Sequence, residues 1–145
     1  MLKRTLISLL LLFIPGLLLV GCGGTSQGES ASQPGDIERG RQLFQQVTIG
    51  PNAAPGCITC HTLQAGQKLV GPSLAGTATK AAEYVEGESY TGSAKTPEAY
   101  LYESIVEPNA FVVEGFPSGV MYQNYDQDLS AEDIDGLVAF LVTLE

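Results

Sequence analysis

Two cysteines and the only histidine of the chain lie within five residues, in the run Cys57-Ile58-Thr59-Cys60-His61. On a turn of helix, residues i and i+3 share a face about 5–6 Å apart, so the two sulfurs of this CxxCH motif can lie on one side. The histidine that follows directly adds a ring nitrogen next to them. The other segments of the chain must fold around this short stretch and whatever it binds.

The first 21 residues have the composition of an export signal. Lys3 and Arg4 give a positive start, and an apolar run over 6–20 follows, interrupted by a Pro-Gly pair. This run is shorter than the ~20 residues of a membrane-spanning helix. We expect 1–21 to be a cleaved signal peptide, and an uncleaved membrane anchor is the alternative.

The apolar run ends in a motif similar to a bacterial lipobox, over 19–22, in which the final cysteine receives a lipid and becomes the new N-terminus. Cys22 is therefore the predicted lipidation site, with a free thiol or a disulfide as the alternatives. The next residues are mostly Gly, Ser and Gln, so 22–35 is predicted to be a lipidated cysteine with a flexible tether. The folded domain is expected at 36–145, outside the cytoplasm and held to a membrane.

In an exported chain, a CxxCH motif indicates covalent attachment of haem, with Cys57 and Cys60 bound to the porphyrin and His61 bound to the iron. A zinc site needs four ligands, but the chain has one histidine and three cysteines, of which Cys22 lies beyond the tether. A thioredoxin-like redox pair needs a βαβ context that is missing here. A disulfide between the motif cysteines would close too small a loop to stabilise much. We therefore expect one haem c.

The sixth iron ligand follows from counting. Once the signal is removed, Met121 is the only methionine, and His61 is already used. Met121 lies in a loop rich in Gly and Pro over 115–121, so it is the expected ligand. The alternatives are an open site or one of the lysines Lys68, Lys80 and Lys95. Ligation by histidine and methionine leaves no position for a small-molecule substrate and suits electron transfer rather than catalysis.

The sequence predicts a helical frame. A first helix is expected over 37–47, with Asp36 as its N-cap and Val47 on its apolar face. A second is expected from 97 to 107, with Thr96 as its cap and a proline at its first position.

The last helix is the clearest, because Ser130 and the acids after it form an N-terminal signature. Apolar residues then follow at helical spacing: Ile134, Leu137, Val138, Leu141 and Leu144. No stretch alternates like a strand. The region 48–96 is expected to be loops with short helical turns, and 76–96 a loop along one haem edge. The predicted fold class is all-α: about three main helices with turns and loops around the haem.

With these features in place, 36–145 resembles class I monohaem cytochrome c. Gly40 and Phe44 look like the family's glycine and aromatic residue on the first helix. The resemblance implies that they cross the last helix at an aromatic residue, here Phe140.

The resemblance also covers the segment after the motif, Gly71-Pro72-Ser73-Leu74. It implies that the carbonyl of Pro72 accepts a hydrogen bond from the Nδ1–H of His61 and orients the ring. Tyr122 departs from the family, which commonly has a proline directly after its methionine ligand.

The chain is acidic, with 7 basic and 16 acidic residues, and removal of 1–21 leaves five against 16, a formal charge of −11. Its basic residues are scattered singly, which excludes nucleic-acid binding. The acids gather at 83–88, 103–114 and 126–135, and the last two groups flank Met121 in sequence. This charge favours a redox partner with a basic docking face. Docking through apolar contacts is the alternative.

The predicted function is a lipid-anchored carrier of single electrons on the outer face of a bacterial membrane, with redox proteins as donor and acceptor. One alternative is a fixed subunit of a larger respiratory or photosynthetic complex. A haem enzyme or gas sensor with an open iron site is disfavoured. A dihaem peroxidase needs a second CxxCH motif, and a cytochrome c-prime type carries its motif near the C-terminus.

Overall fold

The computed structural model describes residues 34–145, so the predicted signal peptide, Cys22 and the tether up to residue 33 lie outside the described residues. The elements in chain order are α1 (Pro34–Phe44), β1 (Thr48–Ile49), β2 (Ala54–Pro55), the 3₁₀ turn η1 (Cys57–Thr59), α2 (Thr77–Glu86), α3 (Pro97–Val106), α4 (Tyr125–Asp128) and α5 (Ala131–Leu141). The all-α prediction is confirmed, since β1 and β2 form only a two-residue antiparallel pair. Within the described range, no helix has the length and apolar character needed to cross a membrane.

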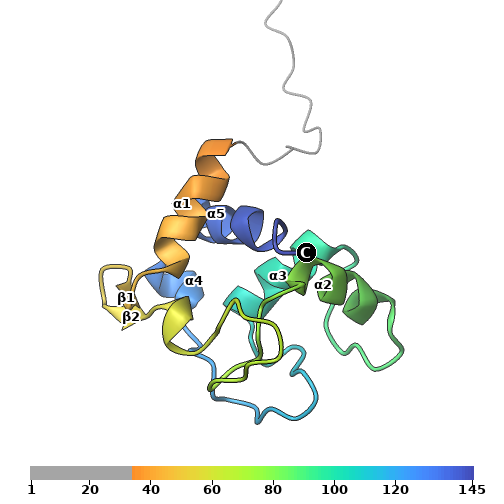
Figure 1. The fold of residues 1–145 in the computed structure, drawn as a ribbon. Coiled ribbons are helices and arrows are strands. Elements are labelled where there is room, and N and C mark those ends of the chain that lie inside the picture. The colour runs from red at the N-terminus through yellow and green to blue at the C-terminus, as the bar shows by residue number, and fades with distance from the viewer. Residues whose placement is uncertain (1–33) are drawn as a thin grey trace, which may run out of the picture.

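Helices α1 and α5 cross at the top of the molecule in Figure 1 and form its most extensive helix–helix contact. A Cβ atom on Gly40 would lie 1.8 Å from the backbone oxygen of Gly136, so the two backbones touch at the crossing. One turn further on, the Phe44 and Phe140 rings pack with their centroids 5.6 Å apart, tilted by 56°. The structure thus brings together the three residues to which the resemblance assigns the helix crossing.

The bounds of α1 differ from the predicted 37–47. The helix begins at Pro34, because a proline has no N–H to satisfy and fits a first helical turn. Asp36 is therefore not the N-cap but lies inside the first turn, where its carboxylate is favoured by the helix dipole. The helix ends at Phe44, which leaves Val47 beyond it and 68% exposed, so the prediction that Val47 extends the apolar face was wrong.

The other two predicted helices are present with the predicted caps. The Thr96 side chain accepts a hydrogen bond from the Ala99 N–H at the start of α3. Ser130 and Asp133 form a reciprocal capping box at the start of α5. Helix α5 ends at Leu141, so Leu144 follows the helix rather than extending it.

Helix α2 corrects the prediction that 76–96 is a loop. It starts after Gly76, whose φ of +69° provides the turn but no side-chain cap, and it packs against α3. Its fully buried residues are the small Thr77 and Ala81, and Tyr84 and Val85 are partly buried against the core. Small residues give a weak periodic signal, so close packing on α3 decides this helix.

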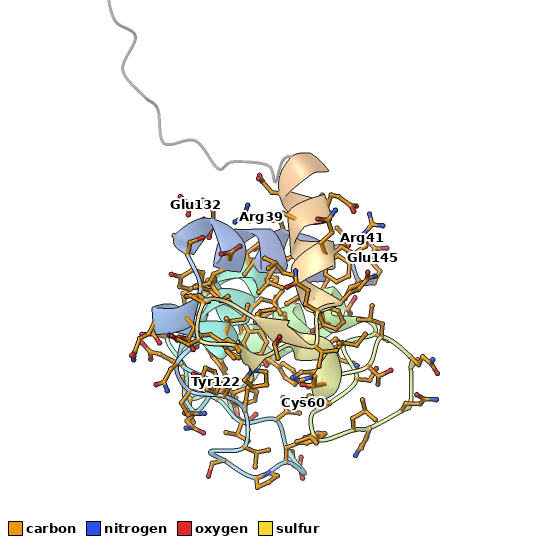
Figure 2. The ribbon with its side chains drawn as sticks, turned by 90° about the vertical axis from the view of Figure 1, so that its left-hand side faces the viewer. Arg39, Arg41, Cys60, Tyr122, Glu132 and Glu145 are labelled. Atoms are coloured by element: carbon orange, nitrogen blue, oxygen red, sulfur yellow. The ribbon has the colours of Figure 1, made fainter. Side chains whose placement is uncertain are left out.

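Two long connections lie away from the α1–α5 crossing, at the bottom of Figure 1: the segment 60–76 and the segment 107–124. Figure 2 shows the same separation from the side. Arg39 and Glu132 lie near the helix crossing, and Cys60 and Tyr122 lie in the lower half of the molecule. The helices thus form one side of the site, and the two long connections form its other walls.

Candidate functional site

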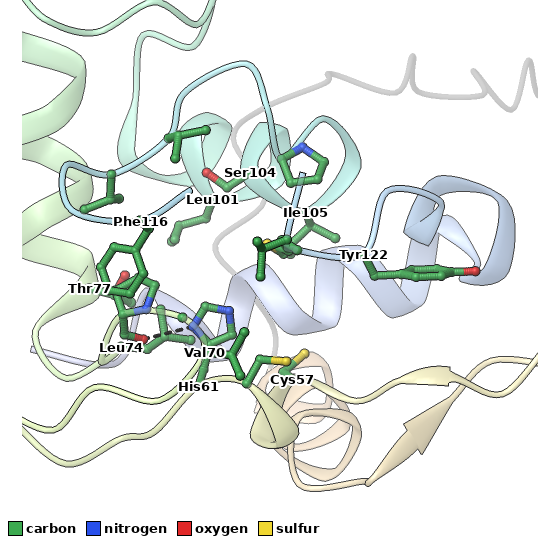
Figure 3. A pocket seen from close by; sticks show the side chains of 18 of the residues that line it. Cys57, His61, Val70, Leu74, Thr77, Leu101, Ser104, Ile105, Phe116 and Tyr122 are labelled. Carbon is green, nitrogen blue, oxygen red and sulfur yellow. Dashed lines mark hydrogen bonds between the residues drawn. The ribbon is translucent and has the colours of Figure 1, made fainter. Parts of the chain in front are cut away.

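A cavity of about 290 Å³ lies between the two long connections and α3. Figure 3 shows Cys57 and His61 on one side of it, with Leu101 and Ile105 of α3 on the opposite side. Most of its lining side chains are apolar. Among the described residues no Asp or Glu lines this cavity, and Lys80 is the single Lys or Arg that does. The cavity is therefore suited to a flat, largely apolar group.

The CxxCH motif begins in η1, where the N–H of Cys60 and of His61 both donate to the Cys57 carbonyl, at 3.2 and 2.9 Å. Gly56 fixes the entry to this turn, since a Cβ there would lie 1.8 Å from the backbone oxygen of Gln46. Both cysteines are free thiols that line the cavity. Burial raises the pKa of Cys57 to about 11, which keeps it a neutral thiol.

The His61 ring is held from one side. Its Nδ1 lies 2.9 Å from the Pro72 carbonyl oxygen, and because a carbonyl only accepts, Nδ1 carries the proton. The lone pair is then on Nε2. Burial lowers the pKa of His61, against the raising effect of the hydrogen bond to Pro72, so the neutral ring is favoured. Figure 3 draws this bond as a dashed line.

Gly71 is a site residue to which the sequence analysis gave no role. A Cβ at this position would lie 2.5 Å from Cε1 of His61 and 2.8 Å from its Nδ1. Only glycine leaves room for the ring to reach the next residue's carbonyl. In the sequence, the only indication of this role is that Gly71 directly precedes Pro72.

Two of the four candidate side chains for the sixth ligand line the cavity. Met121 is half-buried and lines the cavity. Lys80 also lines it, but its ammonium donates to a backbone carbonyl 2.8 Å away. The Lys68 ammonium lies over the Phe116 ring, 5.6 Å from its centroid. Lys95 lines a different surface hollow between α3 and α5.

An aromatic cluster forms one wall of the cavity. Tyr84, Tyr100 and Phe111 line the cavity, and their ring centroids lie 5.3–6.1 Å apart. Tyr90 packs on this cluster and donates a hydrogen bond to Glu103. Burial raises the pKa of Tyr100 to about 12, so its hydroxyl stays neutral. These residues come from α2, α3 and two loops, and no sequence spacing links them.

The acids near Met121 in sequence are dispersed in space. Asp128 is buried, and hydrogen bonds from Tyr122 and Asn52 hold its pKa below the ordinary value. Asp133 pairs with Arg39 at 2.7 Å, near the α1–α5 crossing in Figure 2. The acids over 126–135 therefore do not form one charged rim around Met121.

The donor set fits a covalently held haem. It comprises two thiols three residues apart, a neutral imidazole whose Nε2 carries the lone pair, and one thioether, all on the wall of one cavity. The apolar lining would exclude water from the porphyrin faces. No other group of residues lining this cavity offers both sulfur and imidazole.

The family model described as Cytochrome c matches residues 37–145, about three quarters of the chain and all of the described structure except its first three residues. No curated protein matches the chain.

Proposed function

Because this chain belongs to the cytochrome c family, we propose that it carries single electrons with one haem, held by His61 and Met121, on the outer side of a bacterial membrane. Membership of the family implies a covalent c-type haem and electron transfer, in general without catalysis. When bound, the haem iron supplies the one-electron change. The residues of the chain hold, orient and shield the haem.

The observation that carries this proposal is the shared lining of one cavity by Cys57, Cys60, His61 and Met121. The two cysteines would bind the porphyrin edge, and His61 would offer Nε2 to the iron. Its hydrogen bond to Pro72 fixes both the tautomer and the ring orientation. Met121 would offer its sulfur from the opposite connection, 107–124. A thioether ligand raises the reduction potential and closes the site to substrates.

The visible spectrum of the purified protein in both oxidation states tests the ligand set. In Met121→Ala the haem should stay covalently bound, but the sulfur-to-iron charge-transfer band of the oxidised protein should vanish and the potential should fall. Lys80→Ala is the matched control, because Lys80 is the other candidate on the cavity wall. It should keep the band. If Lys80 is the ligand instead, the oxidised wild type should lack this band, and the ferric spectrum should change in Lys80→Ala but not in Met121→Ala.

Anchoring through Cys22 is the second part of the proposal, supported by the lipobox-like sequence that precedes it. Cys22→Ser should release a red, otherwise intact protein from the membrane fraction. A variant that remains in the membrane and keeps residues 1–21 would identify an uncleaved signal anchor instead. Co-migration of the wild-type protein with larger membrane complexes on native gels would favour a fixed subunit over a free carrier.

The mouth of the cavity is the proposed site of electron exchange. Val70 and Val120 line the cavity and are 53% and 47% exposed, which gives the mouth an apolar rim. The acidic surface would act at longer range and favour a basic partner. Charge can steer the partner while it is still distant, and apolar groups can then make the close contact, so the two are compatible.

A further inference from the structure

Met121 is followed by Tyr122, which also lines the cavity. In Figure 3, the Tyr122 ring points away from His61. Its hydroxyl donates to Oδ2 of Asp128, 2.6 Å away. Asp128 is 5% exposed, and its other oxygen accepts a hydrogen bond from the Asn52 side chain. The residue next to the proposed ligand is therefore tied to a buried carboxylate.

The turn that contains Asn52 also packs against Asp128. Asn52 lies in the turn between β1 and β2, where Gly50 has a φ of +71°. A Cβ on Gly50 would lie 2.4 Å from the backbone oxygen of Asp128, so the turn rests directly on the end of α4. This turn leads through β2 into the CxxCH motif. Asp128 thus joins the Met121 loop to the segment that carries the thiols.

A second connection runs in parallel. The rings of Tyr122 and Tyr125 meet edge to face with their centroids 5.0 Å apart. The Tyr125 hydroxyl donates to the Pro55 carbonyl at 2.6 Å, two residues before Cys57. The ring contact stays when the Tyr122 hydroxyl is removed, so the two connections can be separated by mutation.

We propose that Tyr122 is a positioning residue for Met121: its hydrogen bond to Asp128, which Asn52 supports, holds the methionine sulfur in the cavity. The inference rests on the proposed function, because it assumes that Met121 binds the haem iron. A movement that takes Met121 out of the cavity pulls on Tyr122 and breaks a bond to a buried charged group. Such bonds are among the stronger hydrogen bonds in proteins. The tyrosine thus restrains the loop without a fixed backbone angle at position 122.

The test is the rate at which imidazole replaces the sixth ligand in the oxidised holoprotein. When the loop must open first, the rate follows the open fraction, and loss of one bond to a charged group should raise it roughly tenfold or more. We expect this increase in Tyr122→Phe, which keeps the ring and its contact with Tyr125. The charge-transfer band should also disappear at a lower temperature than in the wild type.

Tyr90→Phe is the matched control. It also removes a hydrogen bond from a tyrosine hydroxyl to a carboxylate, that of Glu103, and Tyr90 does not line the cavity. Its imidazole rate should stay within about twofold of the wild-type rate, even if its free energy of unfolding falls as far as that of Tyr122→Phe. Asn52→Ala should give a smaller increase than Tyr122→Phe, because Asp128 keeps its bond to Tyr122.

Equal imidazole rates in wild type and Tyr122→Phe would overturn the inference, as would equal increases in Tyr122→Phe and Tyr90→Phe. Neither outcome touches the proposed function, provided that Met121→Ala loses the charge-transfer band. An unchanged ferric spectrum in Met121→Ala would instead reject Met121 as the ligand, and the positioning role with it.

Discussion

The tautomer and the orientation of the His61 ring depend on two residues that contact it, Gly71 and Pro72. The Pro72 carbonyl accepts a hydrogen bond from the Nδ1–H, and Gly71 leaves the volume that the ring needs. Gly71 is therefore as important for the position of the ring as Pro72, whose carbonyl accepts the hydrogen bond. The structural reason is steric, since a Cβ at position 71 would meet three atoms of the ring within 3.0 Å.

Gly71→Ala should displace the His61 ring. The new Cβ would lie 2.5 Å from Cε1 of His61 if nothing moved. Relief of this overlap should lower the free energy of unfolding by about 1–3 kcal/mol and reduce the yield of correctly ligated haem. The visible spectrum and thermal melting of the purified variant measure both effects.

Gly66→Ala is the control for this prediction. No atom lies within 4 Å of a Cβ at Gly66, but its φ of +76° makes alanine unfavourable by about 1 kcal/mol. This variant should melt slightly earlier with an unchanged spectrum. An unchanged spectrum in Gly71→Ala as well would show that the ring position does not depend on Gly71.

At the scale of elements, the crossing of α1 and α5 depends on an unequal pair of glycines. A Cβ on Gly40 would meet the Gly136 backbone oxygen at 1.8 Å, whereas a Cβ on Gly136 would meet its nearest atom, the Asp36 oxygen, at 3.2 Å. The helix backbones therefore approach closely at Gly40, and a small adjustment would accommodate a methyl group at Gly136.

Gly40→Ala should lower the free energy of unfolding by about 3 kcal/mol or more, because backbone atoms must move apart. Gly136→Ala should change it by less than about 1 kcal/mol, since the gain in helix propensity offsets the tight contact. Denaturant unfolding of the two holoproteins gives both values. Equal losses, or a larger loss in Gly136→Ala, would contradict this picture of the crossing.

At the scale of the whole molecule, the cavity that the haem would fill borders the hydrophobic core, and Phe44 and Leu137 belong to both. The cavity separates the helical frame from the segment 60–76, in which every residue over 63–70 is exposed. This segment buries little apolar surface of its own to offset the entropy of ordering. Haem binding and folding should therefore be coupled.

Replacement of both Cys57 and Cys60 by serine should abolish covalent haem and leave a largely unfolded domain. Far-ultraviolet circular dichroism should show helicity well below that of the holoprotein, without a cooperative melt. The Met121→Ala protein, which keeps both thioethers, is the folded control. A haem-free double variant with native-like helicity would show that the helices are stable on their own.

The acidic surface predicts the salt dependence of electron transfer with the natural partner. Between about 0.01 and 0.15 M salt the Debye length falls from roughly 30 to 8 Å, so the second-order rate with a basic partner must fall. An uncharged small-molecule reductant serves as the control, and its rate should stay nearly constant. A partner rate that is flat or rises with salt would reject the basic docking face and favour docking through apolar contacts such as Val70 and Val120.

The sequence by itself determined the chemistry and the local signals. The spacing of Cys57, Cys60 and His61 predicted the haem site, and the Thr96 and Ser130 caps predicted the starts of α3 and α5. These features depend on neighbours within about one helical turn, so they can be read along the chain. The Cytochrome c family match over 37–145 agrees with that interpretation.

Only the tertiary structure decided which distant residues share a site. Helix α2 packs on α3, where the Tyr84 and Tyr100 rings meet, and Gly71 leaves room for the ring of His61, ten residues earlier in the chain. Asp128 is one of a group of acids in the sequence, but in the fold it is a buried hydrogen-bond acceptor. It accepts hydrogen bonds from Tyr122 and from Asn52, which lies 76 residues away in the chain. Such contacts join segments that are far apart in sequence, and their strength depends on burial and geometry that exist only once the chain has folded.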